Sequence, residues 1–138
     1  MGRIVALDYG MKRTGIAVSD PLRLIAGGLT TLPSKEIIGF LKQYIAENKV
    51  DLFVLGDPRK MNYESSENRE RVLKFKEELH RAFPDIEIQM VDERFTSVLA
   101  HQAMIQGGLK KKDRQNKSLV DELSATILLQ SFLETNRA

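Results

Sequence analysis

The sequence contains no cysteine and no tryptophan, and only two histidines occur among its 138 residues. The absence of cysteine excludes a disulfide scaffold, a thiolate zinc site and a cysteine nucleophile. His80 and His101 are too few and too scattered for a histidine-based zinc site, and we expect both on solvated helix surfaces. No apolar run approaches the ~20 residues of a membrane span, and residues 3–7 show neither an h-region nor a cleavage site. We therefore expect a cytoplasmic protein without a membrane partner.

An excess of charge of one sign is also missing, because 21 basic and 19 acidic side chains leave a net charge of only +2. Five of the cations, however, lie within residues 110–117, where a single acid accompanies them. A local basic run in a nearly neutral chain indicates contact with a polyanion, although a solvated loop has the same composition. The cations of this run are Lys110, Lys111, Lys112, Arg114 and Lys117.

A single domain is expected across residues 1–138, because a chain of this length buries enough surface for one core. Hydrophobic residues form 42% of the chain and charged residues 29%, a balance typical of globular proteins. The apolar periodicity predicts helices from a Ser34 N-cap onward and at residues 66–83, 98–106 and 118–134. It predicts strands at residues 4–7, 14–19, 24–32, 51–56 and 86–91.

The order of these elements, β-β-β-α-β-α-β-α-α, indicates an α/β fold. The five-residue turn between the first two strands has hairpin length, so these strands should be antiparallel. Gly27-Gly28 predicts a bulge or bend in the third strand. The two helices that connect the later strands should act as right-handed crossovers. The pattern therefore predicts a mixed five-stranded sheet with helices on both faces.

Asp8 ends the first predicted strand on the face that carries Ile4 and Ala6. That face is apolar, so an isolated carboxylate there is costly unless a cation meets it. Gly10 and Gly15 flank the following turn and allow the backbone to approach whatever Asp8 binds. The alternative is an aspartate that only initiates a turn.

Two further acidic positions attract attention for the same reason. Asp92-Glu93-Arg94 follows the last strand, and ligands collect at the carboxyl ends of parallel strands; the alternative is a charged loop. Asp121 shares one helical face with Ala125, Leu128 and Phe132, which are apolar. Ser118-x-x-Asp121 also matches a capping box, and the two roles can coexist.

Metal chemistry gives a reason for carboxylates to converge. Acids in one pocket raise each other's pKa unless cations neutralise them. Oxygen-only ligands suit Mg²⁺ or Mn²⁺, and two such ions about 4 Å apart can hydrolyse a phosphodiester without cysteine or histidine. The acids therefore indicate metal-assisted phosphodiester hydrolysis.

Three motifs in order resemble one known family over essentially the whole chain. Residues 6–20, ALDYGMKRTGIAVSD, closely resemble the opening motif of the YqgF (RuvX) family, described as Holliday-junction-resolvase-like proteins and pre-16S rRNA nucleases. Residues 92–97, DERFTS, and residues 117–125 resemble its second and closing motifs. The middle segment departs from the family pattern: Asp57 stands where Gly-Leu-Pro has its leucine, and Glu64-Ser65 replaces a Gly-Ser step.

The resemblance implies a ribonuclease H-like fold in which Asp8, Glu93 and Asp121 are the catalytic, metal-binding acids, with two Mg²⁺ or Mn²⁺ ions. It implies a cytoplasmic nuclease of ribosome biogenesis that processes the 5′ end of precursor 16S rRNA, in contact with pre-ribosomal particles, as a monomer or homodimer. One alternative is a Holliday junction resolvase, which cuts branched DNA as a two-fold dimer. Others are a non-catalytic nucleic-acid-binding module and an actin-like ATPase, which 138 residues leave without a second domain.

Supporting roles follow for residues near these acids. Arg13 would contact a phosphate or form a salt bridge across the turn. Arg94 would orient Glu93 or pair with Asp92, and we favour the structural role. The basic run of residues 110–117 leads into the catalytic helix, so it should position phosphates without reading sequence. Tyr9 and Tyr63 could stack on bases, but packing is the better explanation.

Overall fold

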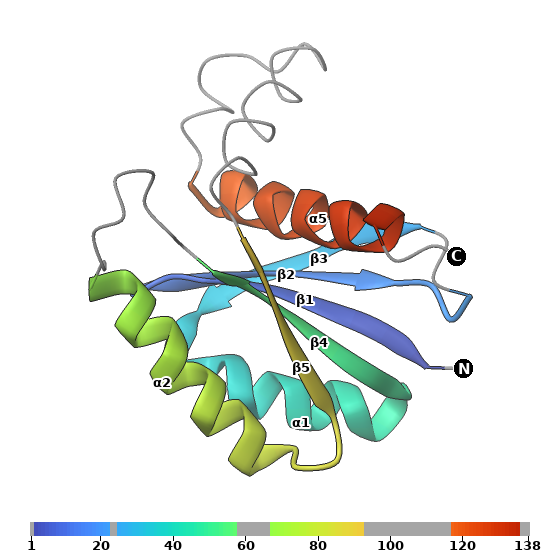
Figure 1. Ribbon diagram of the computed structural model, residues 1–138, viewed down its shortest axis with the longest axis horizontal. Coiled ribbons are helices and arrows are strands. Elements are labelled where there is room, and N and C mark those ends of the chain that lie inside the picture. Colours follow the sequence, from blue (N-terminus) through green and yellow to red (C-terminus); the bar gives the residue numbers. More distant parts are fainter. Residues whose placement is uncertain (1, 23–24, 58–66, 93–116, 136–138) are drawn as a thin grey trace, which may run out of the picture.

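The computed structural model describes residues 2–22, 25–57, 67–92 and 117–135 (Figure 1). It confirms an α/β fold with a five-stranded sheet and helices on both faces. The predicted helix at residues 98–106 lies outside the described residues. The described elements are β1 (Arg3–Tyr9), β2 (Arg13–Ser19), β3 (Ala26–Pro33), the 3₁₀ helix η1 (Ser34–Glu36), α1 (Ile37–Glu47), β4 (Val50–Asp57), α2 (Glu67–Ala82), β5 (Glu87–Asp92) and α5 (Lys117–Thr135).

The sheet has the strand order β3-β2-β1-β4-β5. β1 and β2 are antiparallel, as the short turn predicted, and β2 and β3 are antiparallel as well. β1, β4 and β5 are parallel, which confirms the two crossovers. The predicted irregularity in β3 is present: Ile16 pairs with Thr30 and Ala17 pairs with Gly28, so one extra residue lies between them.

The short apolar run in β1 forms a central strand because both of its faces are covered. Val5 and Leu7 belong to a cluster with α1 and α2, whereas Ile4 and Ala6 belong to a cluster with α5. Figure 1 shows α1 and α2 on one side of the sheet and α5 on the other. The α2 stripe buries Val72, Phe75 and Leu79, and the α5 stripe buries Ala125, Leu128, Leu129, Phe132 and Leu133.

Two expected helix caps are wrong in position. Ser34 is not the N-cap of a regular helix, because the chain forms η1 first with Pro33 as N-cap and without a side-chain capping bond. The Ser34 hydroxyl instead bonds to the β1–β2 turn. α5 begins at Lys117, so Ser118 lies inside the helix. None of the described helices is long and apolar enough to cross a membrane.

Candidate active site

Asp8 lies at the carboxyl end of β1, in the middle of the sheet. It is half-buried and follows Ile4 and Ala6 on the face that α5 covers, as strand alternation predicted. The parallel strands β1, β4 and β5 all end at this edge of the sheet. In sheets of this type, ligands bind outside the carboxyl ends of the strands.

Glycines stand beside Asp8 on both neighbouring strands. Asp8 pairs with Gly15 of β2, whose position the sequence had indicated. On the other side Leu7 pairs with Leu55, so Gly56 continues this register next to Asp8. Because neither glycine has a side chain, the α5 face of the sheet stays open around the carboxylate. Sequence reasoning did not single out Gly56 as a site residue, although a glycine that ends a buried apolar run was the available signal.

The turn after Asp8 requires glycine at position 10. The Gly10 N–H donates to the Arg13 carbonyl oxygen at 2.9 Å. A Cβ atom at Gly10 would lie 2.6 Å from that same oxygen, which is closer than real Cβ contacts. The close approach that Gly10 permits is therefore within the turn itself. Arg13 is half-buried at the first position of β2.

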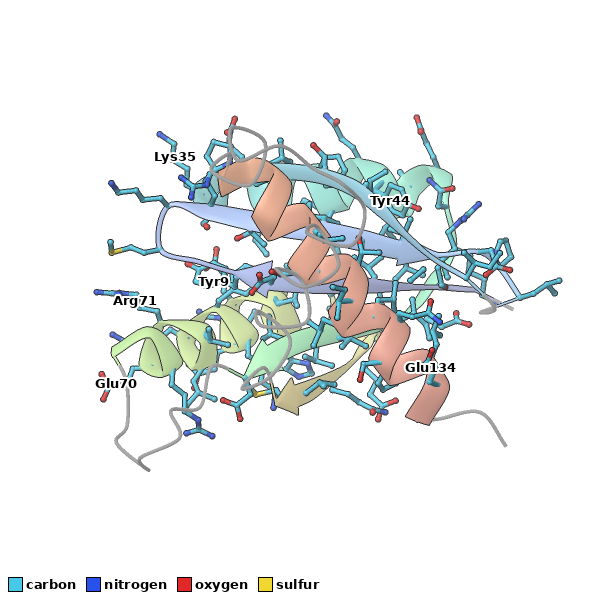
Figure 2. All side chains as sticks on the ribbon, turned by 90° about the horizontal axis from the view of Figure 1, so that it is seen from above. Tyr9, Lys35, Tyr44, Glu70, Arg71 and Glu134 are labelled. Carbon is cyan, nitrogen blue, oxygen red and sulfur yellow. The ribbon has the colours of Figure 1, made fainter. Side chains whose placement is uncertain are left out.

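The start of α5 lies toward the Asp8 end of the sheet. The Ala26 N–H donates to Gln130 Oε1 at 3.4 Å, and Ala26 lies beside the Ile4 end of β1. From Gln130 back to Asp121, nine helical residues rise about 13 Å. From Ile4 to Asp8, four strand residues rise by about the same distance, ~13 Å. Asp121 therefore lies on the part of α5 near the level of Asp8, as Figures 1 and 2 also indicate.

The other predicted site residues are only partly covered by the structure. The backbone of Asp121 and of Lys117 belongs to α5, but their side chains lie outside what is described. Glu93 directly follows the last residue of β5 and lies outside the described residues. Residues 94 and 110–114 lie outside them as well, so the roles of Arg94 and the basic run stay predictions.

The donor set fits a hard divalent cation. Asp8 supplies carboxylate oxygens, which Mg²⁺ and Mn²⁺ prefer, beside the open surface that Gly15 and Gly56 leave. Among the described residues alone, no group of three or more acids or histidines gathers to hold a metal. A complete site therefore requires Glu93, Asp121 or both.

Asp57 forms an ion pair on the opposite face of the sheet from Asp8. Arg69 Nε in α2 donates to Asp57 Oδ1 at 3.0 Å. The Asp57 side chain is 7% exposed and that of Arg69 is 33% exposed. This pair explains why an aspartate is tolerated where the family pattern has leucine. Asp57 is thus a structural acid and does not join Asp8.

Breaking this pair from the arginine side should destabilise the fold, because Asp57 would keep a buried charge without this partner. We expect Arg69→Leu to lower the free energy of unfolding by roughly 1–3 kcal/mol in urea denaturation. The double variant D57L/R69L should recover most of that loss, since it leaves no buried charge. Arg81→Leu, at an exposed position of the same helix, is the control. An Arg69→Leu protein as stable as wild type would contradict the prediction.

Tyr9 packs against α2 and not into the Asp8 site. Its ring stacks on Phe75 with centroids 4.3 Å apart and an interplanar angle of 14°. Burial raises the pKa of the Tyr9 hydroxyl, as does the Glu78 charge, while Arg71 lowers it. Figure 2 shows Tyr9 and Arg71 at the same end of the molecule. The packing role expected for Tyr9 is therefore confirmed.

A hollow of about 610 Å³ lies at the opposite edge of the sheet from Asp8. It is lined by residues 45–50 and 82–86 and includes none of the candidate catalytic acids. His80 is exposed on α2, as expected, whereas His101 lies outside the described residues. The chemistry indicated by the sequence therefore belongs to the Asp8 edge.

Comparisons with known proteins agree over the whole chain. A family model described as "RuvX: Holliday junction resolvase" matches residues 2–135. The chain is 55% identical to a Phocaeicola vulgatus protein and 57% identical to a Bacteroides thetaiotaomicron protein, covering 99% of each chain in both cases. It is 58% identical to an Azobacteroides pseudotrichonymphae protein, covering 97% of each chain. All three relatives bear the name "Putative pre-16S rRNA nuclease".

Among solved structures, the chain resembles "T. thermophilus RuvC in complex with Holliday junction substrate". The TM-score is 0.55 at 16% identity, over 99% of this chain and 97% of that one. At this identity the likeness concerns the fold alone, and it confirms the ribonuclease H-like arrangement.

Proposed function

Because the chain belongs to the RuvX family, we propose that it is a nuclease that hydrolyses phosphodiester bonds in structured nucleic acid. Its proposed substrate is precursor 16S rRNA, cut at the 5′ end, after the name that its relatives bear. This role places the protein in the cytoplasm, in contact with pre-ribosomal particles, with one nuclease domain spanning residues 1–138.

One observation carries the proposal. Asp8 stands at the carboxyl end of the central strand, on the α5 face, with Gly15 and Gly56 on either side. A carboxylate at such a position, next to a surface without side chains, can reach a substrate phosphate that lies across the sheet edge. A merely structural aspartate would need no such opening.

Glu93 and Asp121 complete the proposed site with Asp8. Val91 packs on the α5 side of the sheet, and Glu93 lies two positions further along the chain, which by alternation favours the same side. Asp121 lies one helical turn before Ala125, which is buried against the sheet. These three carboxylates would hold Mg²⁺ or Mn²⁺. When bound, a pair of these ions supplies an activated water and stabilises the leaving oxygen.

Cations around the site would position the substrate. Arg13 follows the turn after Asp8, and Lys117 is the first residue of α5. The remaining cations of residues 110–117 precede that helix in sequence and would contact phosphates without reading bases. Arg94 would hold Glu93 in orientation.

The basic run offers a quantitative test. Replacing the lysines at 110, 111 and 112 by glutamine should weaken substrate binding and flatten its salt dependence, by up to ~0.7–0.9 log units of slope for each phosphate that is no longer neutralised. Binding is measured by fluorescence anisotropy across a series of salt concentrations. A matched control replaces Lys42, Lys49 and Lys76, which lie on α1, after α1 and on α2. Unchanged affinity and slope in the first triple variant would reduce this run to a solvated loop.

Cleavage itself is tested by incubating the purified protein with precursor 16S rRNA and with four-way DNA junctions, each with Mn²⁺ or with EDTA. Mapping the ends of the products identifies the bond that is cut. We expect metal-dependent cleavage of the RNA. Absence of cleavage on both substrates would leave a nucleic-acid-binding module in its place.

The family description favours a second candidate, a Holliday junction resolvase. Such an enzyme must cut two strands symmetrically, so it should act as a two-fold dimer. Symmetric cuts in the four-way junction, together with a dimer in sedimentation experiments, would favour it over the RNA nuclease.

A further inference from the structure

We propose that Lys12, Arg13 and Lys35 form a second phosphate-binding surface, the basic shoulder, which Ser34 holds in place beside Asp8. The inference rests on the proposed function and deepens it, because it names where the nucleic-acid backbone continues beyond the scissile phosphate. Lys12 and Arg13 come from the turn after β1, and Lys35 comes from η1. The partner is the phosphodiester backbone of the same substrate.

Ser34 connects the two segments that carry these cations. Its backbone N–H donates to the Lys12 carbonyl oxygen at 3.0 Å. Its hydroxyl donates to the Gly10 carbonyl oxygen and lies 2.8 Å from Thr14 Oγ1. Since the Ser34 hydroxyl has one hydrogen, Thr14 is the donor in the second hydrogen bond. Three hydrogen bonds at one serine therefore hold the β1–β2 turn against the start of η1.

This hydroxyl pair is buried although it lies beneath an exposed surface. Thr14 is 0% exposed and Ser34 is 9% exposed. Lys12 and Lys35, in contrast, are exposed, and neither forms an ion pair with the residues that the structure describes. A turn that only connects two strands does not require buried side-chain hydrogen bonds beneath its cations. The arrangement fixes the backbone under both lysines relative to Asp8.

The charges favour an anionic partner at this place. The three cations of the basic shoulder have one exposed acid beside them, Glu36. Figure 2 shows Lys35 at the same end of the molecule as Tyr9, which follows Asp8 in the chain, whereas Tyr44 and Glu134 lie toward the other end. A nucleic-acid strand that crosses the carboxyl edge at Asp8 would therefore meet the basic shoulder on the β2–β3 side of the sheet.

The first test is the salt dependence of binding by the metal-free protein, in EDTA, to precursor 16S rRNA. The double variant K12Q/K35Q should bind at least tenfold more weakly at low salt, and its slope should fall by about 0.7–0.9 log units for each phosphate left without its lysine. The control K49Q/R81Q removes the same charge at exposed positions near the opposite edge, and it should match wild type. An unchanged slope in K12Q/K35Q, or an equal loss of affinity in the control, would overturn the proposal.

The second test concerns Ser34 and Thr14 as positioning residues. Thr14→Val keeps the shape of the side chain but removes the donor to Ser34, whereas Thr14→Ser keeps the hydroxyl. We expect Thr14→Val to weaken RNA binding about threefold or more, with Thr14→Ser close to wild type. In the K12Q/K35Q background, Thr14→Val should cause no further loss of affinity. An equal loss in both backgrounds would show that the hydroxyl pair does not act through the lysines.

Binding without metal keeps this inference separate from the proposed catalysis. Wild-type protein that binds RNA with the expected salt slope but never cuts it would overturn the nuclease and leave the basic shoulder standing. Cleavage by a K12Q/K35Q protein with wild-type affinity would do the opposite. Failure of the wild type to bind nucleic acid at all would overturn both.

Discussion

Asp8→Asn should lose nucleic-acid cleavage by roughly 10²–10⁴-fold while the fold is retained. The substitution removes a negative charge but almost no volume, so packing around β1 should not change. Without that charge, the carboxylate cluster cannot hold its cations, and the chemistry that they supply is lost. The measurement is single-turnover cleavage of precursor 16S rRNA in Mg²⁺ or Mn²⁺.

Thermal melting separates this loss from a loss of structure. Wild-type protein should melt at a higher temperature when Mg²⁺ is added, because the metal binds only the folded state. In Asp8→Asn this rise should shrink, and the metal-free variant should melt at or above the wild-type temperature, because like charges no longer repel. Asp85→Asn, at an exposed position in the α2–β5 connection, is the charge-matched control. Near-wild-type cleavage by Asp8→Asn would refute the assignment of the acids.

Asp121→Asn should have the second-largest effect, a loss of metal-dependent cleavage with most of the melting temperature retained. The position of α5 supports a ligand over a cap: the helix begins at Lys117, so Ser118 lies within it. A capping hydrogen bond can be partly imitated by asparagine, whereas a negative charge aimed at a cation cannot. The metal-induced rise in melting temperature should shrink as it does for Asp8→Asn.

Two controls accompany Asp121→Asn. Glu122→Gln removes the same charge one residue further along α5 and should cut like wild type. Ser118→Ala should spare the chemistry, and any capping by this serine would appear as a loss of stability of typically ~1 kcal/mol. An Asp121→Asn protein that melts early and still cuts would make Asp121 a capping residue and leave Asp8 and Glu93 as the acids of the site.

Local pattern was sufficient for most of the fold. The all-apolar run at Val5 predicted a buried central strand, and the helical stripe from Val72 to Leu79 predicted the face that α2 buries. Both predictions depend on side-chain period alone, which each residue's neighbours in the chain determine. Strand alternation likewise placed Asp8 on the face of Ile4 and Ala6, which the structure confirms.

Caps and ion pairs were less accessible, because their partners lie far away along the chain. Ser34 has the composition of a helix cap, yet its hydroxyl bonds to Gly10, 24 residues away. Asp57 looks like a departure from a family pattern until Arg69 is seen to meet it from α2, 12 residues further along the chain. Neither preference can be read from local spacing, since the competing hydrogen bond exists only after the sheet has formed.

The sequence by itself determined the fold class, the antiparallel hairpin after Asp8 and the type of chemistry, because periodicity, turn length and residue type are local properties. Only the tertiary structure decided what surrounds Asp8. The register of β1 between β2 and β4 brings Gly15 and Gly56 to its two sides, and the folding of η1 onto the hairpin brings Lys35 beside Lys12. These are meetings of distant segments, and the free energy that selects them comes from burying the whole sheet between α5 and the α1–α2 layer.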